Sequence, residues 1–193
     1  VLHTVPLDSC VADTQGTIGY MIQQGLYNEF KRRGIKKQVV TVVSQVLVDK
    51  NDLAFKNPTK PIGPFYDEDK AKRYRKERGW NIKEDSGRGW RRVVPSPKPV
   101  RIIELAAAKT LANLGFVAVV VGGGGIPVIE ENGELSGIEA VIDKDYASSL
   151  LAIGIKADLF LISTSVEKVA LNFGKPDQGL LDKMTLEEAK KYY

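Results

Sequence analysis

The chain has 193 residues, one cysteine and a net charge of +4 at pH 7, and this length allows one good hydrophobic core or two small ones. Its single cysteine, Cys10, excludes an internal disulfide and fits a reducing, cytoplasmic compartment. The sequence has no apolar run of about 18 residues, so we expect no membrane span, and its first residues do not read as a signal peptide.

The charge is unevenly distributed along the chain. Residues 53–101 carry 14 Lys and Arg against 6 Asp and Glu, a balance of +8, while the rest of the chain is net negative. Such a basic segment favours an anionic partner. Nucleic acid and a phosphorylated small molecule are two candidates, and a solvated basic surface without a ligand is the alternative.

The first predicted elements are a helix and a buried strand. Apolar side chains recur every three or four residues in 16–33, which predicts a helix, and Gly34 suits its end. Residues 38–48, QVVTVVSQVLV, are mostly β-branched or apolar, as is typical of a strand covered on both faces.

The basic segment interrupts this pattern. Residues 53–99 lose hydrophobic periodicity and gain prolines, so we interpret them as an excursion from the core whose ends lie close together. A short charged helix is predicted within it, at residues 67–79. We refer to residues 53–99 as the lid segment.

Helix and strand patterns then resume. Residues 100–114 are predicted to form a helix, and residues 116–121 a strand that runs into four glycines. Residues 127–142 read as a hairpin, because Asn132-Gly133 is a strong two-residue turn signal.

The last predicted elements are a helix at 143–155, a buried strand at 157–163 and a C-terminal helix capped by Thr185, with Glu188 three residues later. Strands that alternate with helices predict an α/β fold with a mainly parallel sheet and helices on both faces. In such sheets ligands bind at the carboxyl ends of strands. We therefore expect three loops to meet: those after 38–48 and 157–163, and the glycine run.

The glycine run consists of Gly122, Gly123, Gly124 and Gly125. Bare N–H groups in such a loop can surround an anion, and phosphate is the natural candidate. A flexible turn is the alternative, since the run matches neither the Walker loop nor the dinucleotide-binding motif.

Charged residues near two other loops could complete an anion site. Lys50 follows the first strand and could meet a phosphate as a point charge, or could be a solvated loop lysine. Asp143, Lys144 and Asp145 stand where helix 143–155 begins. Either aspartate can cap that helix, but a lysine is unfavourable there unless an anion is bound.

Arg88 lies beside Trp90 in EDSGRGWRRVVPSPKP. Arginine can form two parallel hydrogen bonds with a carboxylate or a phosphate. Arginine beside an aromatic residue also resembles a surface that binds single-stranded nucleic acid. A packed lid with a structural Trp is a third interpretation. His3, the only histidine, lies near the chain end, which argues against Ser–His catalysis, and no zinc signature occurs. The remaining lysines, arginines, aspartates and glycines suit phosphoryl transfer.

A set of segments occurs in one order along the chain: PLDSC, TQGTIGYMIQQGLYNE, VLVDKND, NPTKPIGPFY, EDSGRGWRRVVPSPKP, GGGGIPV, AVIDKDYAS and NFGKPDQ. Together they resemble carbamate kinases, members of the amino acid kinase superfamily, over essentially the whole chain. The resemblance implies a three-layer αβα fold, with residues 1–193 as one partial kinase domain and the lid segment as a protruding subdomain. It also implies a cytoplasmic homodimer that binds neither nucleic acid nor membrane.

The implied activity is reversible phosphoryl transfer between ATP and carbamate, giving carbamoyl phosphate and ADP without a covalent intermediate. Mg²⁺ accompanies the nucleotide, and many members make ATP in this way during arginine breakdown. By resemblance, Lys50 and Lys144 hold the transferring phosphoryl group and Asp145 organises the lysines. The glycine run, Asp143 and Arg88 fall at the substrate and phosphate site. The residues that frame the nucleotide are Thr164, Ser165, Val166, Val169, Phe173, Lys175 and Pro176.

The sequence departs from the family pattern in two ways. The Gly-Gly-Asn turn that precedes PLDSC in the family and the later Met-Gly-Pro-Lys segment are not in this sequence, so it resembles the middle of the enzyme. Ser165 stands where the family has an aspartate near the nucleotide. This difference either bears on nucleotide affinity or metal handling, or is structurally neutral. A catalytically inactive fragment, and a superfamily kinase acting on another small acid, are the alternatives.

Overall fold

The computed structural model describes residues 5–192. The chain divides into two compact units, residues 1–158 and 159–193, and each is considered by itself. His3 lies outside the described residues.

The first unit contains most of the regular structure. Its elements are α1 (Leu7–Arg32), β1 (Val39–Thr41), β2 (Gln45–Val48), a 3₁₀ turn (Leu53–Phe55), β3 (Lys60–Tyr66), α2 (Glu68–Arg78), β4 (Ile82–Glu84), β5 (Trp90–Val94), β6 (Pro99–Ile102), α3 (Leu105–Asn113), β7 (Val117–Val119), a second 3₁₀ turn (Gly122–Gly124), β8 (Ile126–Glu131), β9 (Glu134–Gly137) and α4 (Lys144–Ile155). The second unit contains β10 (Val169–Leu171), β11 (Gly179–Leu181) and α5 (Leu186–Tyr192). Across residues 5–192, every helix is too short or too polar to cross a membrane.

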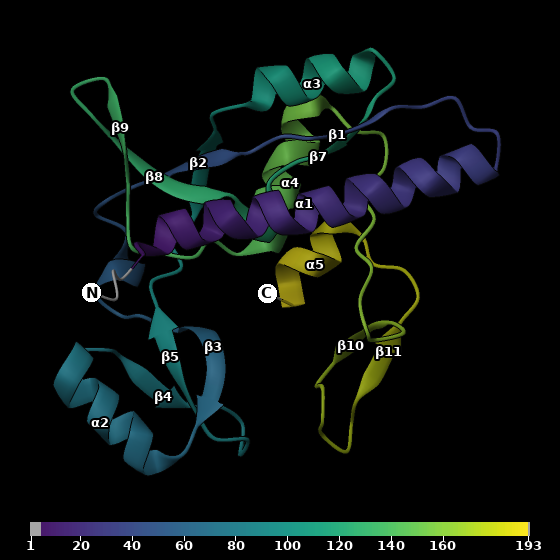
Figure 1. Ribbon diagram of the computed structural model, residues 1–193. Coiled ribbons are helices and arrows are strands. Elements are labelled where there is room, and N and C mark those ends of the chain that lie inside the picture. Colours follow the sequence, from purple (N-terminus) through teal and green to yellow (C-terminus); the bar gives the residue numbers. More distant parts are fainter. Residues whose placement is uncertain (1–4, 193) are drawn as a thin grey trace. The chain divides into compact units, whose positions relative to one another are not determined.

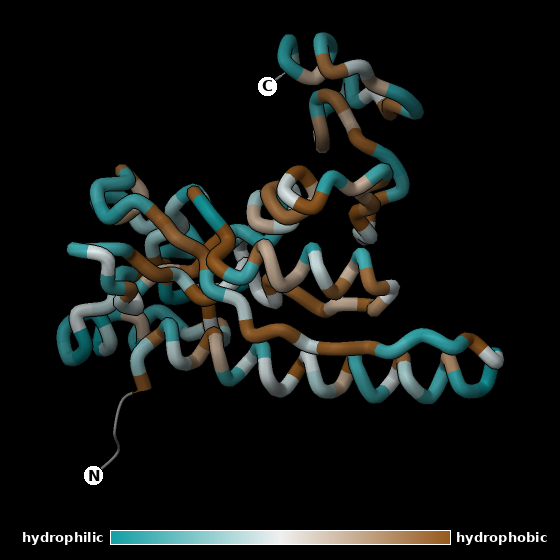
Figure 2. Tube along the Cα trace, turned by 90° about the horizontal axis from the view of Figure 1, so that it is seen from above, coloured by the Kyte–Doolittle hydropathy of each residue, from teal (hydrophilic) through white to brown (hydrophobic). Residues whose placement is uncertain are grey.

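The first unit is built in three layers. α1 packs against β1 and β8 on one face of the strands, and α3 and α4 cover the other face (Figure 1). In Figure 2, α1 lies along the lower edge, with the strands and then α3 and α4 above it. The core on the α4 side contains the buried residues Val46, Val48, Ile102, Val121, Ile142 and Ala147. This arrangement confirms the predicted αβα fold class.

Two parallel strand pairs lie at the centre of the unit. β1 pairs with β7, with Thr41 opposite Val119, and β2 pairs with β8, with Gln45 opposite Ile126. β2 and β8 are the inner strands of a sheet of order β6-β2-β8-β9, in which β6 and β9 are antiparallel edges. The glycine run therefore lies level with the short segment that joins β1 to β2.

The prediction of one continuous strand over residues 38–48 is wrong, because the segment forms β1 and β2 with a break at residues 42–44. Ser44 in this break is fully buried. Its backbone is bound by the side chain of Gln15, and its Oγ accepts the N–H of Val121 at 3.0 Å. These partners are distant in sequence, so a β-branched run gives no sign of them.

The boundaries of two predicted helices also differ. α1 begins at Leu7 instead of residue 16, and it continues through Gly16. The predicted helix 100–114 begins only at Leu105, because residues 99–102 pair with β2 as strand β6 and Ile102 is buried there. An apolar stretch that forms first a strand and then a helix shows neither the two-residue period of a strand nor the 3.6-residue period of a helix clearly.

The lid segment folds around a small antiparallel sheet of order β3-β5-β4, with α2 beside it. The predicted helix is confirmed as α2: the Asp67 side chain accepts the N–H of Lys70 at 2.8 Å, and Gly79, with φ of 64°, ends it. The strands were not predicted. Pro61 and Pro64 lie in β3, and proline argues against a strand assignment from sequence.

The hairpin and the helix after it are confirmed. Asn132 and Gly133 have φ of 54° and 84°, as the type I′ turn between β8 and β9 requires. α4 begins at Lys144 with Asp143 as its capping residue.

The second unit contains the β10–β11 hairpin, in which Val169 lies opposite Leu181, and helix α5. The predicted cap of α5 is confirmed. The Glu188 N–H donates to Thr185 Oγ1 at 3.2 Å, and the Thr185 N–H donates to Glu188 Oε2 at 2.7 Å. This is the reciprocal capping box that the sequence indicates.

The predicted buried strand at residues 157–163 is wrong. These residues form no strand, and the side chains of Leu159 and Leu161 are 78% and 81% exposed. A strand needs a neighbour for its backbone hydrogen bonds, and no segment within residues 5–192 pairs with this one. The expected third loop therefore follows no strand.

Candidate active site

The glycine run forms a tight turn with left-handed backbone. Val121, Gly123, Gly124 and Gly125 have φ of 49°, 66°, 102° and 89°. A Cβ on Gly124 would lie 2.4 Å from the carbonyl oxygen of Ile142, and a Cβ on Gly125 would lie 2.3 Å from Val46 Cγ2. These two glycines are required by packing within the protein.

Gly123 differs from its neighbours. A Cβ at Gly123 would meet no atom within 4 Å, so its backbone faces open space. The expectation that bare backbone is available to a ligand therefore fits Gly123, while close packing accounts for Gly124 and Gly125. Gly122 lies between these cases, with a Cβ position 3.3 Å from Gln15 Cγ.

The N-terminus of α4 lies directly against this turn, through the contact of Gly124 with Ile142. Asp143 caps the helix, because its Oδ1 accepts the N–H of Asp145 at 2.9 Å. Its Oδ2 accepts a hydrogen bond from Lys60 Nζ at 2.7 Å. The Lys60 ammonium is the main cause of a lowered pKa of the Asp143 carboxyl.

Lys144 and Asp145 stand in the first turn of α4. Lys144 Nζ lies 3.4 Å from Asp145 Oδ1, and the two side chains are 73% and 56% exposed. The lysine thus has one weak ionic contact and room to turn toward an anion. Its predicted role at a phosphate site stays a prediction.

Lys50 is not brought to the glycine turn. It follows the carboxyl end of β2, whereas the turn lies level with Ser44 at the other end of that strand. At about 3.3 Å per residue, β2 alone separates them by about 13 Å. Lys50 pairs instead with Glu131 of β8, which raises the pKa of the lysine, beside a cavity of about 510 Å³.

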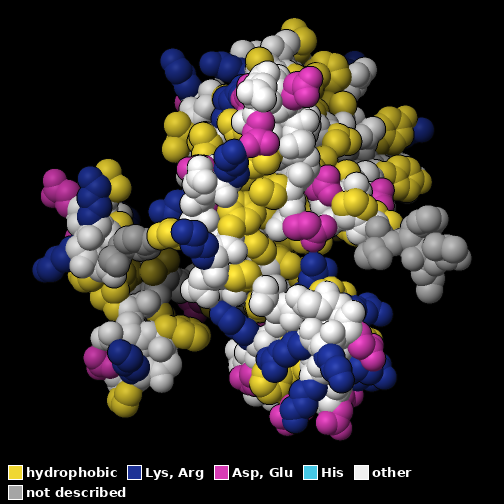
Figure 3. Space-filling model, turned by 90° about the vertical axis from the view of Figure 1, so that its left-hand side faces the viewer, with side chains coloured by type: hydrophobic (Ala, Val, Ile, Leu, Met, Phe, Trp, Pro, Cys, Tyr) yellow, Lys and Arg dark blue, Asp and Glu magenta, His cyan; other side chains and the backbone are white. Residues whose placement is uncertain are grey.

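Arg88 lies in the β4–β5 turn, at the opposite end of the lid sheet from Lys60. Its Nη2 is 3.2 Å from Asp85 Oδ1, and its guanidinium lies 5.0 Å from the centre of the Phe65 ring. Figure 3 shows Lys and Arg side chains gathered over the lid segment. The charge of Arg88 is thus partly balanced within the lid segment itself.

The predicted nucleotide-framing residues belong to the second unit. They occupy the segment before β10, the start of β10 and the turn that joins β10 to β11: Thr164, Ser165 and Val166, then Val169, then Phe173, Lys175 and Pro176. Val169 and Phe173 are 57% and 75% exposed. Both side chains are therefore accessible, and the nucleotide role stays a prediction.

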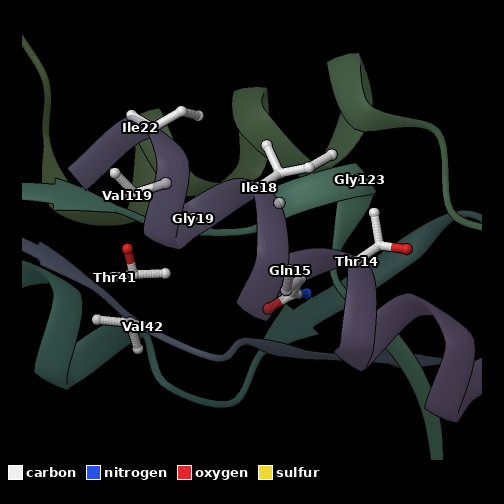
Figure 4. Close-up of a pocket in the computed structure, with 10 residues that line it drawn as sticks. Thr14, Gln15, Ile18, Gly19, Ile22, Thr41, Val42, Val119 and Gly123 are labelled. Atoms are coloured by element: carbon white, nitrogen blue, oxygen red, sulfur yellow. The ribbon is translucent and has the colours of Figure 1, made fainter. Parts of the chain in front are cut away.

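Sequence reasoning missed Lys60 and Gln15. Lys60 is the first residue of β3, and its partner Asp143 is 83 residues away in sequence, so no local pattern points to the pair. Gln15 falls just before the predicted start of α1. It lines an apolar cavity of about 90 Å³ between α1, β1 and the glycine turn (Figure 4).

Comparison with known proteins gives consistent matches. Residues 17–192 match the amino acid kinase family. The chain is 57% identical to a carbamate kinase of Thermococcus kodakarensis and 54% identical to one of Pyrococcus furiosus, over 97% of this chain and 60% of each relative. Carbamate kinase from Giardia lamblia bound to AMP-PNP superposes with a TM-score of 0.80 at 46% identity, over 92% of this chain and 56% of that one. The chain thus spans about 60% of the length of its curated relatives.

Proposed function

Because the chain belongs to the amino acid kinase family, we propose that it takes part in reversible phosphoryl transfer between ATP and carbamate. The identity to carbamate kinases over nearly the whole chain carries this proposal. In the direction that makes ATP, a β-phosphate oxygen of ADP attacks the phosphorus of carbamoyl phosphate. The bond from phosphorus to the carbamate oxygen breaks, and carbamate leaves without a covalent enzyme intermediate.

The residues around the glycine turn suit the charge that moves in this reaction. The open backbone at Gly123 and the N-terminus of α4 favour negative charge. Lys144 supplies a mobile cation for the transferring group, and Asp145 orients it. Protein groups that stabilise transition-state charge in this way can supply most of the rate enhancement in phosphoryl transfer.

Lys50 is proposed as the second lysine of the reaction, as the resemblance implies. A lysine ammonium is charged at neutral pH without its Glu131 partner, because its reference pKa is about 10.4. Lys50 must leave Glu131 to contact a phosphoryl group at the glycine turn, so a change of conformation in this region is part of the proposal.

The nucleotide is proposed to bring Mg²⁺ with it. Among residues 5–192, no group of three or more His, Cys, Asp or Glu side chains could hold a metal ion, so an all-protein magnesium site does not fit. Magnesium on nucleotide phosphates needs only one or two carboxylates, and the exposed Asp145 suits that role. The ion would neutralise phosphate charge.

The wider setting is proposed from the same resemblance. We infer one kinase domain with the lid segment closing over the substrate, a homodimer, and a cytoplasmic enzyme that serves arginine breakdown. Exposed large apolar side chains along α1 support a partner subunit: Ile18, Tyr20, Met21, Ile22 and Tyr27. Analytical ultracentrifugation would test the dimer.

Phosphorus NMR of the 193-residue chain with ADP, Mg²⁺ and carbamoyl phosphate tests the activity. We expect the γ-phosphate signal of ATP to grow, and Lys144→Ala to slow it about 10²- to 10³-fold. Lys36→Ala, at an exposed lysine after α1, is the matched control and should leave the rate unchanged. A folded chain that forms no ATP would contradict catalysis by this chain.

A further inference from the structure

A cavity in the lid segment is lined by cations and other hydrogen-bond donors. Its volume of about 290 Å³ is close to the lower end of the range for small-molecule pockets. The polar side chains that line it belong to Lys56, Asn57, Arg75, Trp80, Asn81 and Lys83. Three of them are cations and none is an anion, so the cavity favours a negatively charged occupant.

The register of the lid sheet brings this lining together. Lys60 of β3 pairs with Val94 of β5, so residues 56–58, which precede β3, lie beyond the carboxyl end of β5. On the other side of β5, the Asn81 carbonyl oxygen accepts the N–H of Val93 at 2.7 Å, just before β4 begins. The loop before β3 and the start of β4 therefore lie on the two sides of one end of β5, with α2 beside the sheet (Figure 1).

Arg75 of α2 is held at the cavity by two contacts. Its Nη2 donates to the carbonyl oxygen of Ile82, and its guanidinium lies 5.0 Å from the centre of the Trp90 ring. The hydrogen bond occupies one of the five N–H groups of the guanidinium. A cation that is already fixed loses less conformational freedom when a ligand binds.

The other donors at the cavity have no partner within the described chain. Across residues 5–192, the side chains of Lys56, Asn57, Asn81 and Lys83 form no hydrogen bond or ion pair, and the indole N–H of Trp80 has no acceptor. Polar side chains that gather around one cavity without protein partners are available to a ligand or to water.

Elsewhere in the lid segment, acidic side chains compensate several of the cations. Arg88 and Arg91 contact the two oxygens of Asp85 at 3.2 and 3.3 Å, and Lys72 pairs with Glu68 at 2.9 Å. The cavity is therefore a place where the positive charge of the lid segment is not compensated. An anion bound there would relieve the mutual repulsion of the three cations.

We propose that this cavity is a binding site for a small multivalent oxyanion, namely the diphosphate group of a small molecule. Arginine binds phosphate oxygens through two parallel N–H groups, and lysines add point charges. No residue of the glycine turn or of α4 lines the cavity, so the inference does not depend on the proposed function. A bound diphosphate joins the loop before β3 to α2 and β4, and thereby stabilises the lid segment.

Tryptophan fluorescence during titration with inorganic pyrophosphate tests the proposal, because Trp80 lines the cavity. The full 193-residue chain is used, at constant ionic strength and without Mg²⁺. Lys56→Ala and Lys83→Ala should each weaken binding about tenfold, since each removes a charged hydrogen-bond donor. Neither side chain has a protein partner among residues 5–192, so both variants are expected to fold.

Two further variants locate the bound anion. Lys76→Ala removes the same charge from an exposed position of α2 outside the cavity, and it should change the affinity by less than about twofold. Lys144→Ala, at the start of α4, should also leave the affinity unchanged. Inorganic phosphate should bind more weakly than pyrophosphate, because it offers fewer oxygens and charges to the three cations.

Three results would overturn the proposal. The first is the absence of saturable binding. The second is a loss of affinity in Lys144→Ala but not in Lys56→Ala or Lys83→Ala, which would place the anion at the glycine turn. The third is an equal loss in Lys76→Ala and Lys83→Ala, which would indicate a diffuse basic surface of the kind that binds nucleic acid. A chain that makes no ATP but binds pyrophosphate in the expected pattern would refute the proposed function and leave this inference standing.

Discussion

The side chain of Gln15 in α1 binds both backbone polar groups of Ser44. Its Oε1 accepts the Ser44 N–H at 2.8 Å, and its Nε2 donates to the Ser44 carbonyl oxygen at 3.0 Å. The carbonyl also accepts the N–H of Ile126 at 2.8 Å. One side chain thus compensates for the backbone pairing that the break between β1 and β2 removes.

Gln15→Leu is therefore expected to destabilise the chain. The buried Ser44 N–H loses its acceptor, which costs about 1–3 kcal/mol in the free energy of unfolding. Gln24→Leu, at an exposed position of the same helix, should change it by less than about 0.5 kcal/mol. Urea unfolding of the two variants measures the difference, and equal values would show that the Gln15–Ser44 contact contributes little.

The glycine turn gives a graded prediction. Gly124→Ala should cost about 3 kcal/mol or more, because a Cβ 2.4 Å from the Ile142 carbonyl oxygen adds a steric clash to left-handed strain. Gly123→Ala has the same kind of strain but open space, so about 1 kcal/mol is expected. Thermal unfolding of both variants ranks them, and a larger loss for Gly123→Ala would contradict this explanation.

The cap of α2 is expected to stabilise the lid segment. Asp67→Ala removes the acceptor for the Lys70 N–H and should cost about 1 kcal/mol in the free energy of unfolding. Asp69→Ala, two residues later in the same helix, leaves that acceptor in place. Both tryptophans of the chain, Trp80 and Trp90, lie in the lid segment, so their fluorescence during denaturation reports on it directly. Identical midpoints for the two variants would exclude a contribution of the cap.

The Lys60–Asp143 pair predicts a pH dependence. The pKa of Asp143 is lowered chiefly by the hydrogen bond from Lys60, so the carboxylate stabilises the folded chain above its unfolded pKa of about 3.9. This contribution is lost as pH falls through the lower pKa of the folded chain. Asp143→Asn and Lys60→Met should both lose less stability than the unchanged chain on acidification from pH 6. A parallel loss in all three would refute the assignment.

The sequence predicted those features whose signals are local. The Asn132-Gly133 turn, an aspartate cap at the start of α4 and the Thr185–Glu188 capping box each depend on residues within three or four positions of one another, and each is confirmed. Of the two aspartates that the sequence offered as the cap, the structure has Asp143. The fold class was also predicted. The alternation of strands and helices indicates an α/β fold with helices on both faces of a sheet, and the family resemblance implies the three-layer αβα arrangement.

The features that were missed depend on distant partners. Ser44 breaks a β-branched run because Gln15, 29 residues earlier, binds its backbone. Lys60 reaches Asp143 across 83 residues. Lys50 could be identified as a candidate from its motif, but its distance from the glycine turn follows from the register of β2 and β8, which composition does not encode.

The exposed segment after α4 has a consequence for the behaviour of the chain in solution. Leu159, Phe160, Leu161 and Ile162 are consecutive, uncharged and exposed, and such apolar, proline-free runs are templates for intermolecular β-pairing. Asp158 is the charged residue immediately before the run, and the next charge does not come until Glu167. Self-association through residues 159–162 is therefore expected to limit the working concentration of the chain at conditions where both units are still folded.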